Sequence, residues 1–139
     1  MVGTVTDGIS DIRKKHAALQ DCAAELFRAL DAGDAAVARG ALTTLLTAIE
    51  VHVRADVALG YRLLLRHPSD AVRRIAERVL RDQEAFPKEL ERFIATWRDA
   101  GREAMVTPAF RDELETLVSE LLKRIRVEQR LVEMLSSVA

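Results

Sequence analysis

The sequence predicts an all-α fold, an antiparallel up-down-up-down four-helix bundle, from its composition, its chain breaks and its apolar spacing. Of the 139 residues, 49% are hydrophobic but only 4% are aromatic. A core built from aliphatic side chains in a chain rich in strong helix formers favours packed helices over a sheet. The length suits one domain covering residues 1–139.

Three breaks separate the expected helices. Residues 31–34 supply a glycine suited to a helix C-terminus and then Asp34 as an N-cap. At 67–70, Ser69 is placed to cap the next helix, and Thr107 followed by Pro108 reads as an N-cap before a first-turn proline. The helices are therefore expected at about 9–31, 35–66, 70–98 and 108–136. Short connections between them predict antiparallel neighbours.

Within each expected helix, apolar residues recur at steps of three and four, which keeps one stripe turned toward the other helices. The apolar members of the four stripes are Ile9, Ile12, Leu19, Ala23, Leu26 and Leu30; Leu42, Leu45, Ile49, Leu59 and Leu63; Val72, Ala76, Val79, Phe86, Leu90, Phe93 and Trp97; and Phe110, Leu114, Leu117, Leu121, Leu131 and Leu135. Polar residues interrupt the four stripes at six positions: His16, His52, Asp56, Gln83, Arg124 and Glu128. Folding the chain at its breaks brings these positions to similar heights, since a helix rises about 1.5 Å per residue. We therefore expect one polar site near the middle of the bundle.

The residue types in this site are those that hold a transition metal. His52 and Asp56 are four residues apart, as are Arg124 and Glu128, so each pair projects from one helix face. Two imidazoles and two carboxylates suit iron, manganese or zinc, whereas magnesium and calcium prefer more oxygen ligands. Buried carboxylates also require a nearby cation, which Arg124 or a bound metal can supply.

The order of these elements resembles the hemerythrin-like, or HHE cation-binding, family. That family has a first-helix histidine, a His-x-x-x-Glu motif, a histidine-bearing third helix and a second His-x-x-x-Glu motif. The resemblance spans essentially the whole chain and rests on residues 12–16 (IRKKH), 52–56 (HVRAD), 82–86 (DQEAF) and 124–128 (RIRVE). It implies a hemerythrin-like bundle, which in fully equipped members holds two carboxylate-bridged irons for dioxygen binding or for iron and oxygen sensing.

The same resemblance implies which of the family's metal ligands are present in this chain. One metal would be held by His16, His52, Asp56 and Glu128. The second iron depends on third- and fourth-helix histidines, and this chain has Gln83, Pro87 and Arg124 there. We therefore expect a degenerate site with at most one divalent metal, in which Gln83 and Arg124 form a polar network in place of the second metal. We do not expect dioxygen carriage by two irons. We expect a binding or regulatory module instead.

Two other functions stay open. The polar residues can satisfy one another without metal and set the helix register of a structural or protein-interaction bundle. A homodimer or an unidentified protein partner could then use the leucines at 63–65 and 121–122. Alternatively, a single iron could support oxygen or peroxide chemistry. The chain has no Gly-rich phosphate loop, CxxC or HExxH motif, so we do not expect an enzyme.

Charge and cysteine content narrow the partners and the compartment. Lys and Arg number 21 against 22 Asp and Glu, so no broad positive field would attract nucleic acid. No stretch resembles a signal peptide or an uncharged membrane span of about 20 residues, so no membrane partner is expected. Cys22 is the only cysteine, which excludes an internal disulfide and suits a reducing compartment. The expected location is cytoplasmic.

Overall fold

The structure, a computed structural model, describes the backbone of residues 2–59 and 65–138. Within its helices, the side chains at 2–12, 54–59, 79, 82–84, 131–132 and 134–138 are outside the description. The described residues form α1 (Val2–Asp31), α2 (Ala35–Leu59), α4 (Asp70–Trp97), α5 (Arg102–Met105) and α6 (Pro108–Val138), with no strand among them. The all-α prediction is therefore confirmed.

Most of the helix bounds agree with the sequence prediction to within two residues. Two bounds are revised, and one short helix was not predicted. Helix α1 begins at Val2 instead of residue 9, although Gly3 and Gly8 lower the intrinsic helix propensity of this segment. The second helix was expected to reach residue 66, but residues 65 and 66 form a turn, so that bound is wrong. The one-turn helix α5 was not predicted, because four residues are too few to show an apolar period.

The connection between α1 and α2 follows the predicted capping chemistry. Gly33 has a φ of 72°, and its N–H donates to the Leu30 carbonyl at 3.1 Å. The N–H of Asp34 donates to the Ala29 carbonyl at 3.0 Å, which completes a Schellman motif at the end of α1. The Asp34 carboxylate then accepts a 3.1 Å hydrogen bond from the Val37 N–H at the start of α2. Both predicted roles, the C-terminal glycine and the aspartate N-cap, are confirmed.

The other two caps differ from each other. The Thr107 hydroxyl accepts from the Phe110 N–H at 3.3 Å, so the predicted N-cap of α6 is confirmed. Ser69 occupies the N-cap position of α4 with extended backbone angles, but its side chain makes no capping hydrogen bond. Instead, the Ser69 N–H donates to His67 Nδ1 at 3.0 Å. The predicted position of this cap is right and the predicted hydrogen bond is wrong.

Gly33, in the connection between α1 and α2, and Gly40, inside α2, make a matched pair for a stability test. Gly33→Ala should destabilise the protein by about 1–2 kcal/mol, because a φ of 72° is a left-handed conformation that a Cβ disfavours. Gly40 lies inside α2, where a Cβ would meet nothing within 4 Å. Gly40→Ala should therefore stabilise the protein by about 0.5–1 kcal/mol. Urea unfolding measures both, and two changes of the same sign would contradict the assigned backbone conformations.

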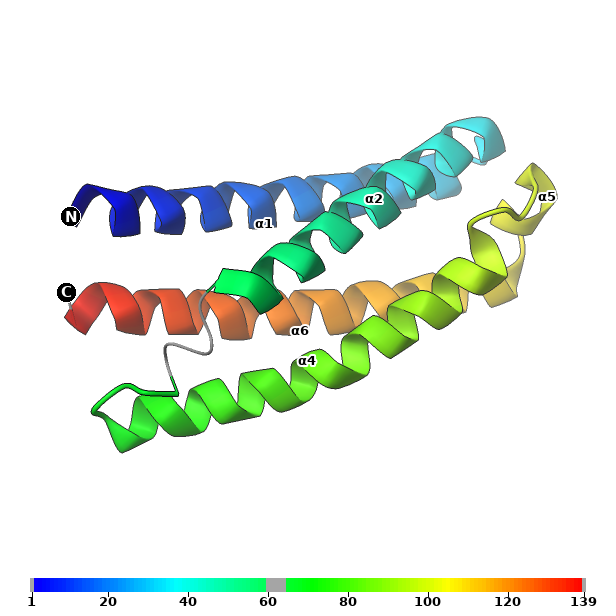
Figure 1. The fold of residues 1–139 in the computed structure, drawn as a ribbon. Helices are drawn as coiled ribbons and strands as arrows, with labels where there is room; N and C mark the ends of the chain where they lie inside the picture. Colours follow the sequence, from blue (N-terminus) through cyan, green and yellow to red (C-terminus); the bar gives the residue numbers. More distant parts are fainter. Residues whose placement is uncertain (1, 60–64, 139) are drawn as a thin grey trace.

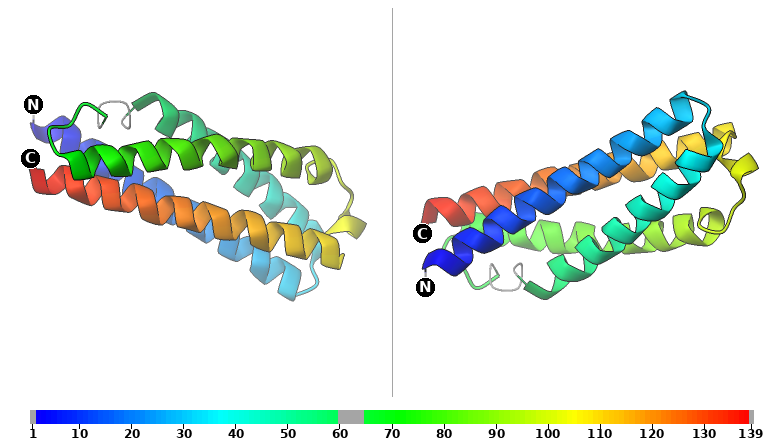
Figure 2. Two further views of the ribbon diagram at one scale, coloured as in Figure 1. Left: turned by 90° about the horizontal axis from the view of Figure 1, so that it is seen from below. Right: turned by 90° about the horizontal axis from the view of Figure 1, so that it is seen from above.

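The long helices lie lengthwise beside one another. The two chain ends lie at the same end of the molecule, and α5 lies at the opposite end (Figure 1). Helix α1 makes its most extensive contacts with α2, and α4 with α6. The views from below and above agree that α6 runs beside α4 and α1 beside α2 (Figure 2). The polar site expected from the sequence, which is built from inward-facing positions, would therefore lie in the interior between these helices.

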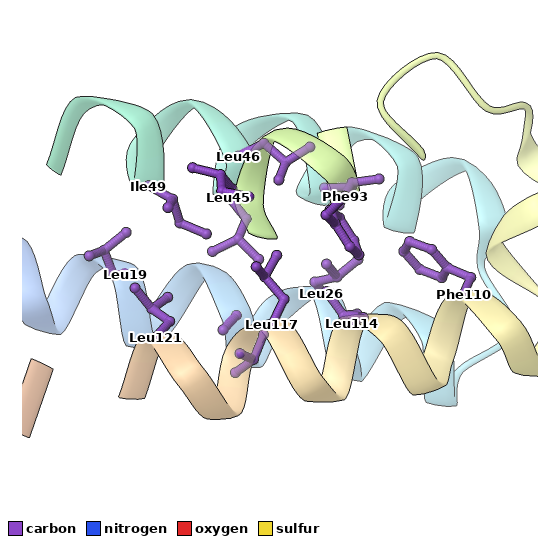
Figure 3. Packing of buried hydrophobic residues seen from close by; sticks show 14 of the residues in the cluster. Leu19, Leu26, Leu45, Leu46, Ile49, Phe93, Phe110, Leu114, Leu117 and Leu121 are labelled. Carbon is purple, nitrogen blue, oxygen red and sulfur yellow. The ribbon is translucent and has the colours of Figure 1, made fainter. Parts of the chain in front are cut away.

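One hydrophobic cluster joins all five described helices, including Met105 from α5. Its members pack between the helices in the half of the molecule that holds α5, and Figure 3 shows part of this packing from close by. The stripes predicted from the sequence are largely buried, and further buried residues lie beside them because a core-facing stripe is wider than one residue. The buried residues that the stripes omitted are Ala29, Ala38, Leu46, Met105, Val118 and Ile125.

The structure bears on two sequence expectations, the suggested dimer face and the absence of a membrane-spanning stretch. Leu121 is only 1% exposed, so it cannot contribute to the suggested dimer face. Leu65 and Leu122 of that face are half-buried, and residues 63 and 64 lie outside the described residues. Among the described helices, the 35–53 stretch of α2 is long and apolar enough, by length and composition alone, to cross a membrane. This stretch contains Arg39 and Glu50, so the expectation that no uncharged stretch of about 20 residues occurs is not contradicted. Leu42, Leu45 and Ile49 of this stretch are fully buried against the other helices, as in the core helix of a globular protein.

Candidate metal centre

A polar layer continues the hydrophobic core toward the end of the molecule that holds the chain termini. Leu19, Ile49 and Leu121 lie toward that side of the core, opposite Phe110 (Figure 3). His16, His52 and Arg124 each lie three residues beyond one of them, hence on the same helix face. The apolar stripes of three helices thus run directly into three buried polar side chains.

Glu128 stands at the centre of this layer. Its side chain is fully buried, and its Oε2 lies 2.8 Å from His16 Nε2 and 2.9 Å from His52 Nε2. Its other oxygen, Oε1, accepts a 3.0 Å hydrogen bond from Arg124 Nε. The two imidazole rings meet edge to face, with centroids 5.0 Å apart. We call these four residues, His16, His52, Arg124 and Glu128, the central cluster.

Only one of the three guanidinium nitrogens of Arg124 makes a hydrogen bond in the described part of the chain. Arg124 is 9% exposed, and its Cζ lies 5.3 Å from the centroid of the Phe86 ring on α4, a cation–π contact. Its Nη1 and Nη2 atoms are buried and have no hydrogen-bond partner in the described part of the chain, and the same holds for His16 Nδ1. Leaving a buried polar group unsatisfied costs about 1–3 kcal/mol, so a hydrogen-bonding partner such as a water molecule or an anion would stabilise the site.

The structure brings together four of the six residues singled out in the sequence. Asp56 and Gln83 lie within α2 and α4, but their side chains are outside the described set. Phe86 was expected only as a core residue, and its contact with Arg124 was missed. The spacing held a signal, since Phe86 follows Gln83 by three residues and so shares its helix face.

The remaining histidine and the cysteine lie away from the central cluster. His67 sits in the turn before α4, where its Nδ1 accepts the Ser69 N–H. Cys22 is a half-buried free thiol on α1. Burial, with added repulsion from Glu25 and Asp21, raises the pKa of the Cys22 thiol above its ordinary value. The thiol therefore stays protonated at neutral pH, which suits packing and disfavours metal binding or nucleophilic chemistry.

The donor atoms of the central cluster fit a divalent transition metal. Ligand atoms from His16, His52 and Glu128 all lie within 4.8 Å of one another, and all three residues are buried. Zinc and similar metals bind imidazole nitrogen and carboxylate oxygen at about 2.0–2.2 Å, so small side-chain shifts would bring the three around one ion. Two histidines and one carboxylate are a set that leaves further coordination positions open. Arg124, by holding Oε1, orients the carboxylate and leaves Oε2 toward the imidazoles.

One member of the central cluster, His52, borders a surface groove. The groove, of about 490 Å³, lies between α1 and α2 and is lined elsewhere mainly by small and hydroxyl side chains such as Ala18, Thr44 and Thr47. His52 itself is only 3% exposed, so the groove reaches the edge of the central cluster without exposing it. Comparison of the chain with protein-family models, curated proteins and solved structures gives no match.

Proposed function

We propose that this chain is a degenerate hemerythrin-like domain, an up-down-up-down four-helix bundle that acts as a binding or regulatory module with one divalent metal at its centre. His16, His52 and Glu128 hold the metal, and Asp56 joins them as the resemblance implies. Arg124 takes the place of a second metal. Iron, manganese and zinc are the ions whose ligand preferences match this set.

One observation carries the proposal. The Nε2 atoms of two buried histidines, on different helices, lie within 2.9 Å of the same carboxylate oxygen. Imidazole nitrogens and a carboxylate oxygen gathered at one buried point are the donor set that a single transition-metal ion binds. A cation drawn to Oε2 gives both imidazoles a common function. Once bound there, the metal supplies a Lewis-acidic centre with open positions.

A metal-free structural bundle is the second candidate, favoured by a different feature of the same cluster. The Glu128 carboxylate already receives polar contacts from α1, α2 and α6, so it can tie these helices together without an ion. In that case the cluster specifies helix register and the protein acts through its surface.

Metal content separates the two candidates. We expect purified protein, loaded with iron, manganese or zinc and then desalted, to retain about one metal ion per chain. His52→Ala should lose that metal, because it removes one of three described ligands. His67→Ala is the matched control, since His67 lies in a turn outside the cluster, and it should retain the metal. Negligible metal in the wild-type protein, with undiminished thermal stability, would support the metal-free bundle.

A further inference from the structure

We propose that the two terminal nitrogens of Arg124 form a subsite for a small planar oxyanion, a carboxylate of the size of formate, which binds together with the central metal. The proposal rests on the metal centre proposed above and adds a second ligand to it. Nothing in the metal assignment itself requires this subsite.

The orientation of the guanidinium determines the chemical class of the ligand. Arg124 Nε donates to Glu128 Oε1 at 3.0 Å, so this edge of the guanidinium is occupied. The Phe86 ring packs against the guanidinium, with its centroid 5.3 Å from Cζ. What remains is the outer edge, where Nη1 and Nη2 are buried without a partner among the described residues. Two parallel N–H groups on that edge match the two oxygens of a planar carboxylate.

Charge explains why the oxyanion and the metal should bind together. Without metal, Arg124 and Glu128 balance each other. A divalent cation on the described ligands leaves an excess of about two positive charges in a buried site, and a carboxylate from Asp56 would remove only one of them. An anion bound to the guanidinium in the same buried site reduces this excess. Binding of each ligand must then strengthen binding of the other by the same factor.

Cobalt(II) and sodium formate are the probes that test this coupling. The cobalt affinity of the full-length protein is measured in a buffer without coordinating anions, and again with saturating formate. We expect formate to raise the cobalt affinity of the wild-type protein by about tenfold or more, within the usual range of coupling between sites. Arg124→Lys keeps the charge but lacks the two-pronged edge, so the gain should fall to about twofold or less. Arg126→Lys, an exposed position on the same helix, should behave as wild type.

The outcomes distinguish the subsite from the metal centre. Stoichiometric cobalt binding that formate does not change would overturn the subsite and leave the metal centre standing. An equal gain in Arg124→Lys would place formate on the metal alone and would also overturn it. Absence of cobalt binding would overturn both proposals.

A measurement on the wild-type protein keeps the test decisive if Arg124→Lys does not fold. In the zinc-loaded protein, the formate proton should show a nuclear Overhauser effect to the Phe86 ring, which packs against the Arg124 guanidinium. Bound formate without any contact to Phe86 would contradict the subsite.

Discussion

Replacing Arg124 by leucine is expected to destabilise the metal-free protein by about 3–5 kcal/mol. The substitution removes the guanidinium that donates to Glu128 Oε1 and leaves a fully buried carboxylate without its described cation. Breaking a buried ion pair by removing one partner is among the most destabilising single changes known for proteins. Urea unfolding of protein treated with a chelator measures the effect.

Two further variants assign this loss to the ion pair. Arg124→Leu combined with Glu128→Leu should recover most of the stability, because neither charge then remains buried alone. Arg126→Leu changes an exposed arginine on the same helix and should cost at most about 0.5 kcal/mol. If Arg124→Leu also stayed within about 1 kcal/mol of wild type, Arg124 would not be the main compensating charge for Glu128.

The second large effect concerns metal binding. Glu128→Gln should lower the affinity for a divalent metal by about 100-fold or more, because it replaces the carboxylate on which both imidazoles converge. The amide keeps the size of the side chain but carries no negative charge. Titration with zinc in competition with a chromogenic chelator measures the change.

The control for Glu128→Gln is a glutamate on the same helix. Glu120 pairs with Lys123 and lies outside the central cluster, so Glu120→Gln should leave zinc affinity unchanged. Equal affinities of Glu128→Gln and wild-type protein would place the metal elsewhere in the chain.

Much of the fold could be predicted from the sequence because its signals are local. Asp34 and Thr107 cap their helices as their positions predict, since a cap depends only on a few neighbouring residues. Helix propensity did not predict the first turns of α1, because the glycines and β-branched residues there are weak helix formers and nevertheless lie in the helix. The short helix α5 carries Met105 into the core, and such a contribution depends on tertiary packing that no local pattern reveals.

The central cluster could be predicted because its polar residues interrupt apolar stripes of fixed period. The spacing placed His16, His52 and Glu128 on inward faces, and the structure brings them together. The spacing did not reveal that both imidazoles approach the same oxygen, or that Arg124 packs against Phe86. These details depend on side-chain rotamers and on the relative rotation of helices, which the apolar period leaves undetermined.

X-ray absorption spectroscopy of the zinc-loaded protein is the most direct measurement of the central claim. A metal held by His16, His52 and Glu128 predicts a first shell with two imidazole nitrogens at about 2.0–2.1 Å and at least one oxygen, with the multiple scattering typical of imidazole rings. A shell of oxygen atoms alone, or zinc bound through the Cys22 sulfur at about 2.3 Å, would contradict the assignment.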